Sequence, residues 1–149
     1  MFLGRGYDEI SIGDRFERVM TLTETHIVLG AGLFNDFNPV HVNQQFAAQT
    51  IYQGRIAHGY LTSNFMAAHL GMIVEGTGIA YLEHNIRFTA PVRAGDTLSS
   101  VWVVSAKDDK AKYDGGIASF TGICTNQRDE KVAEAEAKML MRKQLPAGG

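Results

Sequence analysis

An aspartate and a histidine five positions apart, Asp36 and His41, are the residues most able to do chemistry. Pro39, which lies between them, pushes Asn38 out of the helical region, so a preceding helix must end here. The proline also stiffens the turn that leads to His41, and the two side chains can converge on one point from a rigid loop. A carboxylate and an imidazole so placed can hold a water molecule and move protons to and from it near neutral pH.

These residues also have structural interpretations. Asp36 could belong only to a turn, where Asp and Asn are favoured, and His41 could be a hydrogen-bonded loop histidine. We favour catalysis because Asn38 and Pro39 stand in register with both. We expect His58 to cap a helix rather than to transfer protons. The remaining histidines have no carboxylate at a spacing that supports catalysis and no metal-ligand spacing, so structural roles are expected for them: His26, His69 and His84.

Two helices are expected to position this segment. Thr21-Leu-Thr-Glu24 has the pattern of a capping box and predicts a helix of roughly ten residues that ends near 35–38. A longer helix is predicted from His58-Gly59, with Gly71 or Gly76 as its end. Its apolar side chains at helical spacing are expected to pack in the core: Leu61, Phe65, Ala68 and Met72.

From Ile79 onward the hydrophobic period changes from that of a helix to that of a strand. The clearest strand covers residues 132–141, where Ala and Met alternate with Glu and Lys. Further strands are expected between turn residues at 81–90, 97–106 and 116–126, and residues 14–22 can supply a first strand. Helices first and hairpin-linked strands later predict an α+β domain with an antiparallel sheet packed on its helices.

The composition is that of one folded domain, residues 1–149, with a flexible tail over 141–149. Fourteen basic and sixteen acidic residues give a net charge of −2 without a cationic cluster, which argues against a nucleic-acid or anionic-membrane partner. The longest uncharged segment is interrupted by His, Thr, Ser and Asn, so it makes a poor membrane span.

The single cysteine, Cys124, excludes an intrachain disulfide and a cysteine-cluster zinc site, and it fits a reducing compartment. It lies in a predicted strand, where we expect it to be buried rather than nucleophilic. Charged residues interrupt the N-terminus where a signal peptide needs an apolar core. We therefore expect a cytoplasmic protein.

The Asp36–His41 segment resembles the hydratase-2 motif of the MaoC-like dehydratases, the (R)-specific enoyl-CoA hydratases. That motif reads Gly or Ser, any residue, Asp, any residue, Asn, Pro, a hydrophobic residue and His, with a small residue six positions later. The matching residues are Asp36, Asn38, Pro39, Val40, His41 and Ala47. Segments 55–61 and 87–96 resemble two further family blocks, and the resemblance spans about 14–141. The departure at Phe34 bears on the shape of the acyl pocket rather than on the chemistry.

The resemblance implies a hot-dog fold, in which a curved antiparallel sheet wraps a long central helix, usually in a homodimer or higher oligomer with active sites near the subunit interface. It also implies reversible syn addition of water to a trans-2-enoyl thioester, giving the (R)-3-hydroxyacyl product. Asp36 and His41 would activate the water that attacks C3 and return a proton to C2, as a coupled pair without separate acid and base assignments.

The backbone N–H of Gly59, at the start of the central helix, would bind the thioester oxygen; the alternative is that Gly59 is only a helix-entry glycine. No metal or redox cofactor is required, because coenzyme A (or acyl carrier protein) arrives with the acyl thioester substrate.

Two other functions remain open. A thioesterase could share the fold, although its carboxylate is expected on or near the central helix, where residues 59–74 contain no Asp or Glu. A non-catalytic module could bind acyl thioesters, but binding alone does not need both Asp36 and His41.

Overall fold

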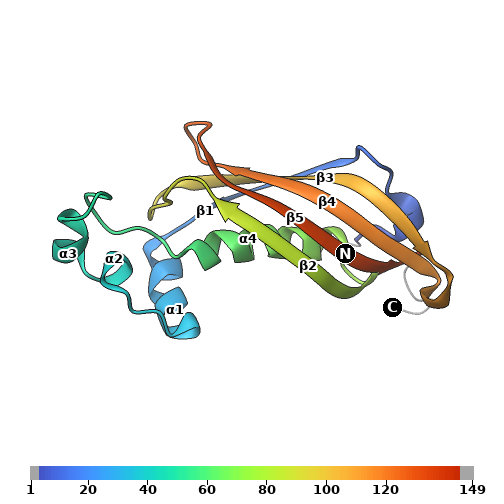
Figure 1. Cartoon of the computed structure of the whole chain (residues 1–149), viewed down its shortest axis with the longest axis horizontal. Helices are drawn as coiled ribbons and strands as arrows, with labels where there is room; N and C mark the ends of the chain where they lie inside the picture. Colours follow the sequence, from blue (N-terminus) through green and yellow to red (C-terminus); the bar gives the residue numbers. More distant parts are fainter. Residues whose placement is uncertain (1–3, 145–149) are drawn as a thin grey trace.

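A computed structural model of the chain describes residues 4–144, which form a five-stranded antiparallel sheet curved around one long helix (Figure 1). In chain order the helices are α1 (Glu24–Phe34), α2 (Pro39–Val42), α3 (Gln44–Ala48) and α4 (Gly59–Ile73). The strands are β1 (Arg15–Thr21), β2 (Gly78–Phe88), β3 (Thr97–Lys110), β4 (Gly115–Thr125) and β5 (Lys131–Arg142), and two 3₁₀ turns cover Tyr7–Glu9 and Ala111–Tyr113. The predicted α+β architecture is confirmed.

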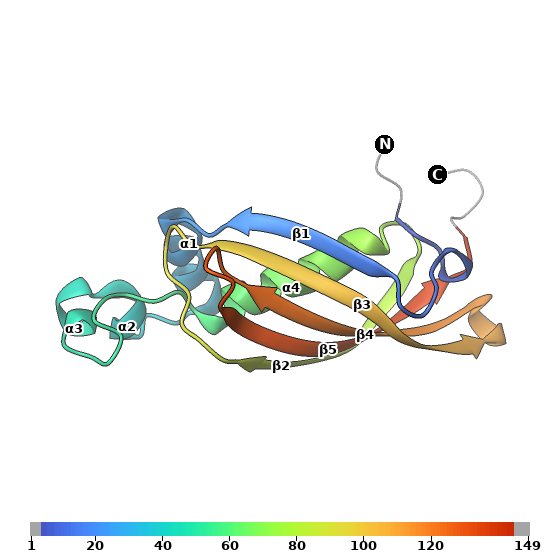
Figure 2. The ribbon, with the colours of Figure 1, turned by 90° about the horizontal axis from the view of Figure 1, so that it is seen from above.

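The strands lie in the order β1-β3-β4-β5-β2, so β1 and β2 are the two edges of the sheet (Figure 2). The core lies between the sheet and α4. On β5 the inward face is the predicted one: Ala133, Ala135, Ala137, Met139 and Met141 are buried. The three alanines are small and let the helix approach the sheet closely. The Trp102 indole N–H donates to the Met66 carbonyl oxygen at 3.0 Å, which ties β3 to the middle of α4.

The buried side of α4 differs from the predicted stripe. Phe65 is buried, but Ala68 and Met72 are exposed, and Met66 and Leu70 take their place in the core. The helix is apolar on most sides, so its sequence alone leaves the inward face ambiguous. Its end also falls at neither predicted glycine: α4 runs to Ile73.

The N-cap of α1 lies two residues after the predicted one. Thr21 is the last residue of β1 and pairs with Thr97, so it cannot start a helix. Thr23 is the N-cap instead, and its backbone N–H donates to Nδ1 of His26 at 2.9 Å. The capping-box pattern of Thr21-Leu-Thr-Glu24 therefore predicts the helix correctly but places its N-cap two residues too early.

The tail expected from residue 141 overlaps β5, whose last two residues are Met141 and Arg142, and residues 145–149 lie outside the described part of the chain. No helix within residues 4–144 has the length and apolar character needed to cross a bilayer. The short helices α1, α2 and α3 gather at one end of the molecule, where α4 begins (Figure 1). This junction sets where functional side chains can meet.

Candidate active site

Asp36 is held by the way α1 ends. The helix ends at Phe34, one residue before the predicted range of 35–38, because Asn35 adopts the left-handed conformation with φ 54°. The Asp36 N–H then donates to the Ala31 carbonyl at 3.0 Å, a closing bond typical of helix C-termini. One carboxylate oxygen of Asp36, Oδ1, accepts the Asn38 N–H at 3.1 Å. The other carboxylate oxygen, Oδ2, takes no part in this hydrogen bond.

His41 lies on the single turn of α2, which Asn38 caps and Pro39 starts. Nδ1 of His41 is 2.9 Å from the backbone oxygen of Ile56. Because a carbonyl oxygen only accepts hydrogen bonds, Nδ1 must carry the hydrogen, and Nε2 of the neutral ring is a bare acceptor. The Ile56 carbonyl therefore selects the tautomer that can take a proton from water.

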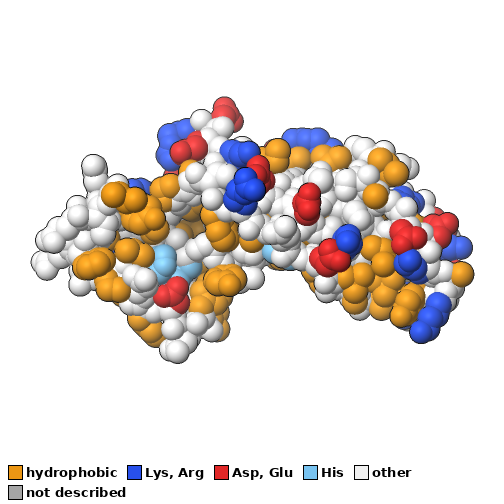
Figure 3. All heavy atoms as spheres, in the orientation of Figure 1, with side chains coloured by type: hydrophobic (Ala, Val, Ile, Leu, Met, Phe, Trp, Pro, Cys, Tyr) orange, Lys and Arg blue, Asp and Glu red, His pale blue; other side chains and the backbone are white. Residues whose placement is uncertain are grey.

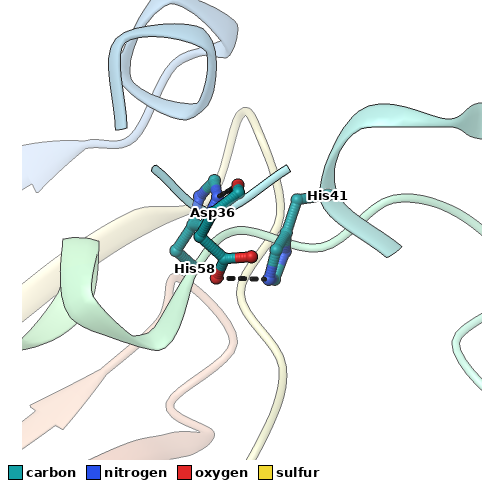
Figure 4. A group of neighbouring side chains, drawn as sticks. All are labelled: Asp36, His41 and His58. Atoms are coloured by element: carbon teal, nitrogen blue, oxygen red, sulfur yellow. Dashed lines mark hydrogen bonds and ion pairs between the residues drawn. The ribbon is translucent and has the colours of Figure 1, made fainter. Parts of the chain in front are cut away.

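The bare Nε2 of His41 lies 3.8 Å from Oδ2 of Asp36 (Figure 4). This gap is too wide for a direct hydrogen bond, and both atoms are acceptors. A water molecule between them can donate one hydrogen to each. Figure 3 shows histidine atoms beside an acidic side chain at the surface, at the end of the molecule where α1, α2 and α3 gather.

His58 lies directly under this pair and is fully buried. Its side chain does not cap α4, contrary to our expectation. Instead Nε2 donates to the backbone oxygen of Asp36 at 2.9 Å, and the ring stacks on that of His41 with centroids 3.9 Å apart and planes 30° apart. The Phe34 ring meets His58 edge-on at 5.7 Å. His58 thus joins the start of α4 to the Asp36 loop.

Donor atoms of Asp36, His41 and His58 lie within 4.8 Å of one another, the spacing of a metal-ligand set. However, the two rings are stacked, so the lone pairs on their bare nitrogens lie in nearly parallel planes rather than pointing at one ion. Two imidazole ligands of one metal must aim at it from about 2.0–2.1 Å. The geometry favours proton transfer over metal binding.

Gly59 and His41 line the same pocket, which has a volume of about 360 Å³ and is also lined by Thr62 and Phe88. Gly59 is the first residue of α4, and its N–H has no acceptor among residues 4–144. A Cβ atom at this position would lie 3.0 Å from the Phe88 ring. The glycine therefore lets the backbone donor face the pocket beside His41.

The other predicted structural residues lie away from this pocket. Nδ1 of His69 is 3.1 Å from Oγ of Ser100, and burial lowers the pKa of His69 to about 4. Cys124 is buried, and burial raises the pKa of its thiol to about 12, which makes it a poor nucleophile. A second cavity, of about 600 Å³, is lined by His69, Arg18 and Phe16 among others, and it contains none of the predicted catalytic residues.

Sequence reasoning missed two parts of the site, namely the stacking of His58 on His41 and the carbonyl of Ile56. Ile56 lies fifteen residues from His41, and no local pattern marks a main-chain oxygen as a partner. The His58-Gly59 dipeptide predicts a helix start, and its histidine is the only sequence signal for the contact with His41.

Comparison with known proteins gives a consistent result. The family described as MaoC like domain matches residues 10–120. The (R)-specific enoyl-CoA hydratase of Rhodospirillum rubrum is 35% identical over 143 residues, which cover 96% of this chain and 93% of that protein. An unliganded R-hydratase structure from Pseudomonas aeruginosa superposes with a TM-score of 0.82 at 29% identity, covering 95% of this chain and 88% of that one. An (R)-hydratase from Aeromonas caviae gives 0.76 at 26%, covering 92% and 98%.

Proposed function

Because this chain belongs to the MaoC-like domain family, we propose that it is a hydro-lyase that adds water reversibly to a trans-2-enoyl thioester to give the (R)-3-hydroxyacyl product. The observation that carries the proposal is the pairing of Asp36 and His41 across 3.8 Å beside the pocket that holds Gly59. Relatives named (R)-specific enoyl-CoA hydratase and 3-hydroxybutyryl-CoA dehydratase support this reaction.

In the hydration direction, the water held between Oδ2 of Asp36 and Nε2 of His41 attacks C3 of the enoyl group. A proton of that water passes to the pair as the new C–O bond forms. The electrons of the C2–C3 double bond move toward the thioester carbonyl, and C2 then takes a proton from the pair. Because both groups contact the same water, we treat the pair as one acid–base unit without separate acid and base assignments.

The negative charge that develops on the thioester oxygen is stabilised by the free N–H of Gly59. This donor stands at the N-terminus of α4, where the helix dipole adds to its effect. Removing a donor of this kind typically reduces turnover by about 10²–10³. Gly59 is therefore assigned a role as large as that of a single member of the pair.

The substrate brings coenzyme A with it, so the proposed reaction needs no separate cofactor. We place it in the cytoplasm, consistent with the lone thiol of Cys124. We also propose a homodimer. Four large apolar side chains on or next to α1–α3 are exposed to solvent, where a partner could cover them: Leu33, Phe37, Phe46 and Ile51. In addition, the edge strand β2 pairs with a neighbour on one side only within residues 4–144. Light scattering that gives the mass of one chain would contradict the dimer.

The decisive experiment replaces each member of the pair without changing its shape. Asp36→Asn and His41→Gln should each lower the rate of crotonyl-CoA hydration by about 10²–10⁴, as followed by the ultraviolet absorbance of the conjugated thioester. Asp129→Asn, in the exposed β4–β5 turn, is the matched control and should keep full activity. Wild-type rates in either pair variant would refute the mechanism. A thiol reagent that detects free CoA would point to a thioesterase instead.

A further inference from the structure

Three polar side chains form a hydrogen-bonded chain between α4 and β2 that the proposed reaction does not use. The hydroxyl of Tyr81 lies 2.7 Å from Nδ1 of His84, and Nε2 of His84 lies 3.1 Å from Oγ of Ser63. Ser63 is only 8% exposed, whereas Tyr81 is 38% exposed. The chain thus runs from the surface of the edge strand to a buried position on the central helix.

A β-bulge puts Tyr81 on the inner face of β2. Residues three apart on a regular strand point to opposite faces. Here the register with β5 shifts between Tyr81 and Glu83, so one extra residue lies between them. Tyr81 pairs with Met139 and His84 with Ala137, and both of these partners are buried. The bulge therefore turns the phenol inward, where it meets His84.

A count of hydrogens shows that this chain has one donor to spare. Burial raises the pKa of Tyr81 to about 12 and lowers the pKa of His84, so the phenol stays protonated and the imidazole neutral. The three groups then hold three hydrogens and share two hydrogen bonds. The 2.7 Å contact fits an O–H donor and the 3.1 Å contact fits an N–H donor. Tyr81 thus donates to His84, and His84 donates to Ser63.

The spare hydrogen is therefore on the buried hydroxyl of Ser63, which has no other partner among residues 4–144. Ser63 and Gly59 are four residues apart on α4 and lie on one face of the helix, about 6 Å apart along its axis. On β2, the Phe88 ring packs at Gly59 while His84 contacts Ser63, so both strand residues follow the same helix face. The pocket beside Gly59 is lined by Thr62, the residue before Ser63, and not by Ser63 itself, so an acyl chain bound there reaches the Ser63 hydroxyl by extending past the Phe88 ring, which is 47% exposed.

We propose that Ser63, held by His84 and Tyr81, donates a hydrogen bond to an oxygen on the acyl group, and that the preferred substrates are short enoyl thioesters with a neutral hydroxyl or carbonyl oxygen beyond C3. A carboxylate fits less well, because the three side chains bring no positive charge to a buried position. This inference rests on the proposed function and adds the substrate class to it.

The test compares two thioesters of nearly equal shape, 5-hydroxyhex-2-enoyl-CoA and 5-methylhex-2-enoyl-CoA. The wild-type protein should hydrate the hydroxylated compound with a kcat/KM about tenfold higher, the ratio expected for one net hydrogen bond. Ser63→Ala should bring the ratio close to one by lowering the rate for the hydroxylated substrate only. Tyr81→Phe, which keeps the ring, is a second variant in case Ser63→Ala fails to fold, and it should reduce the ratio. Ser105→Ala, at an exposed position on β3, is the matched control.

Equal kcat/KM values for the two compounds in the wild-type protein would overturn the inference. So would a Ser63→Ala variant that slows both substrates equally, because that result indicates a purely structural role. Crotonyl-CoA, which has no atom to reach Ser63, separates this failure from a failure of the proposed function. If the protein hydrates crotonyl-CoA but shows equal kcat/KM for the two hexenoyl-CoA compounds, only the substrate class is refuted. If it hydrates no enoyl thioester, the proposed function is refuted as well.

Discussion

The role of Gly59 can be separated from its packing because a single ring faces it. A Cβ atom built at Gly59 lies 3.0 Å from two carbons of the Phe88 ring, closer than ordinary van der Waals contact. Phe88 is the last residue of β2 and is 47% exposed, so its ring can move by the few tenths of an ångström needed. Overpacking costs about 1–3 kcal/mol in a closed core, and this site falls at the low end. Replacing glycine in a helix returns about 0.5–1 kcal/mol.

We therefore expect Gly59→Ala to change the free energy of unfolding by no more than about 1 kcal/mol, as measured by urea denaturation. Its effect on catalysis should be much larger. The methyl group stands next to the N–H that must come within about 2.7–3.1 Å of the thioester oxygen, so kcat for crotonyl-CoA hydration should fall by about 10² or more.

The double variant Gly59→Ala/Phe88→Leu distinguishes the two explanations for the glycine. The smaller leucine relieves the contact with the added methyl group but leaves that methyl group beside the substrate. Its kcat should stay as low as that of Gly59→Ala, with Phe88→Leu alone as the reference for the altered pocket wall. If the double variant recovers the activity of Phe88→Leu, the glycine serves only to make room for the ring, and the oxyanion assignment is wrong.

Two further predictions concern stability. Burial lowers the pKa of His69 to about 4, so below pH 6.5 the unfolded chain binds a proton at His69 that the folded chain does not bind. Acidification from neutral pH to near 5 should therefore lower the unfolding free energy of the wild-type protein by about 2 kcal/mol relative to His69→Gln. Urea denaturation at both pH values measures this difference. Asn35→Val places a β-branched residue at φ 54° and should lower the unfolding free energy by about 1–2 kcal/mol and slow hydration by displacing Asp36, whereas Asn35→Gly should keep both properties.

The parts of the structure that the sequence predicts are those with local causes. Pro39 excludes a helical conformation at Asn38, which is enough to predict that α1 ends before it and that a turn separates Asp36 from His41, although the left-handed Asn35 is what ends the helix. The alternation along β5 is similarly local, since each residue's face follows from its neighbours. The start of α1 was misplaced because Thr21 and Thr23 offer the same hydroxyl, and only the pairing of β1 with β3 decides between them.

The parts that could not be predicted depend on contacts between distant segments. A period of two puts Tyr81 and His84 on opposite faces of β2, and nothing in the residues between them marks the bulge that reverses this. The same is true of the inward face of α4, which its contact with the sheet selects. His58 was assigned to a helix cap because its neighbours in sequence suggest one, whereas its hydrogen bond goes to Asp36, twenty-two residues away.

The protonation of the site follows from two main-chain oxygens. The Ile56 carbonyl accepts Nδ1–H of His41, and the Asp36 carbonyl accepts Nε2–H of His58, so each neutral ring keeps one bare nitrogen. For His41 that nitrogen faces the carboxylate of Asp36, and two acceptors facing each other need a hydrogen donor between them. Water is such a donor, because it can give one hydrogen to each acceptor. In the reaction that we propose, the loops that meet at the start of α4 therefore bind the water before any acyl thioester binds.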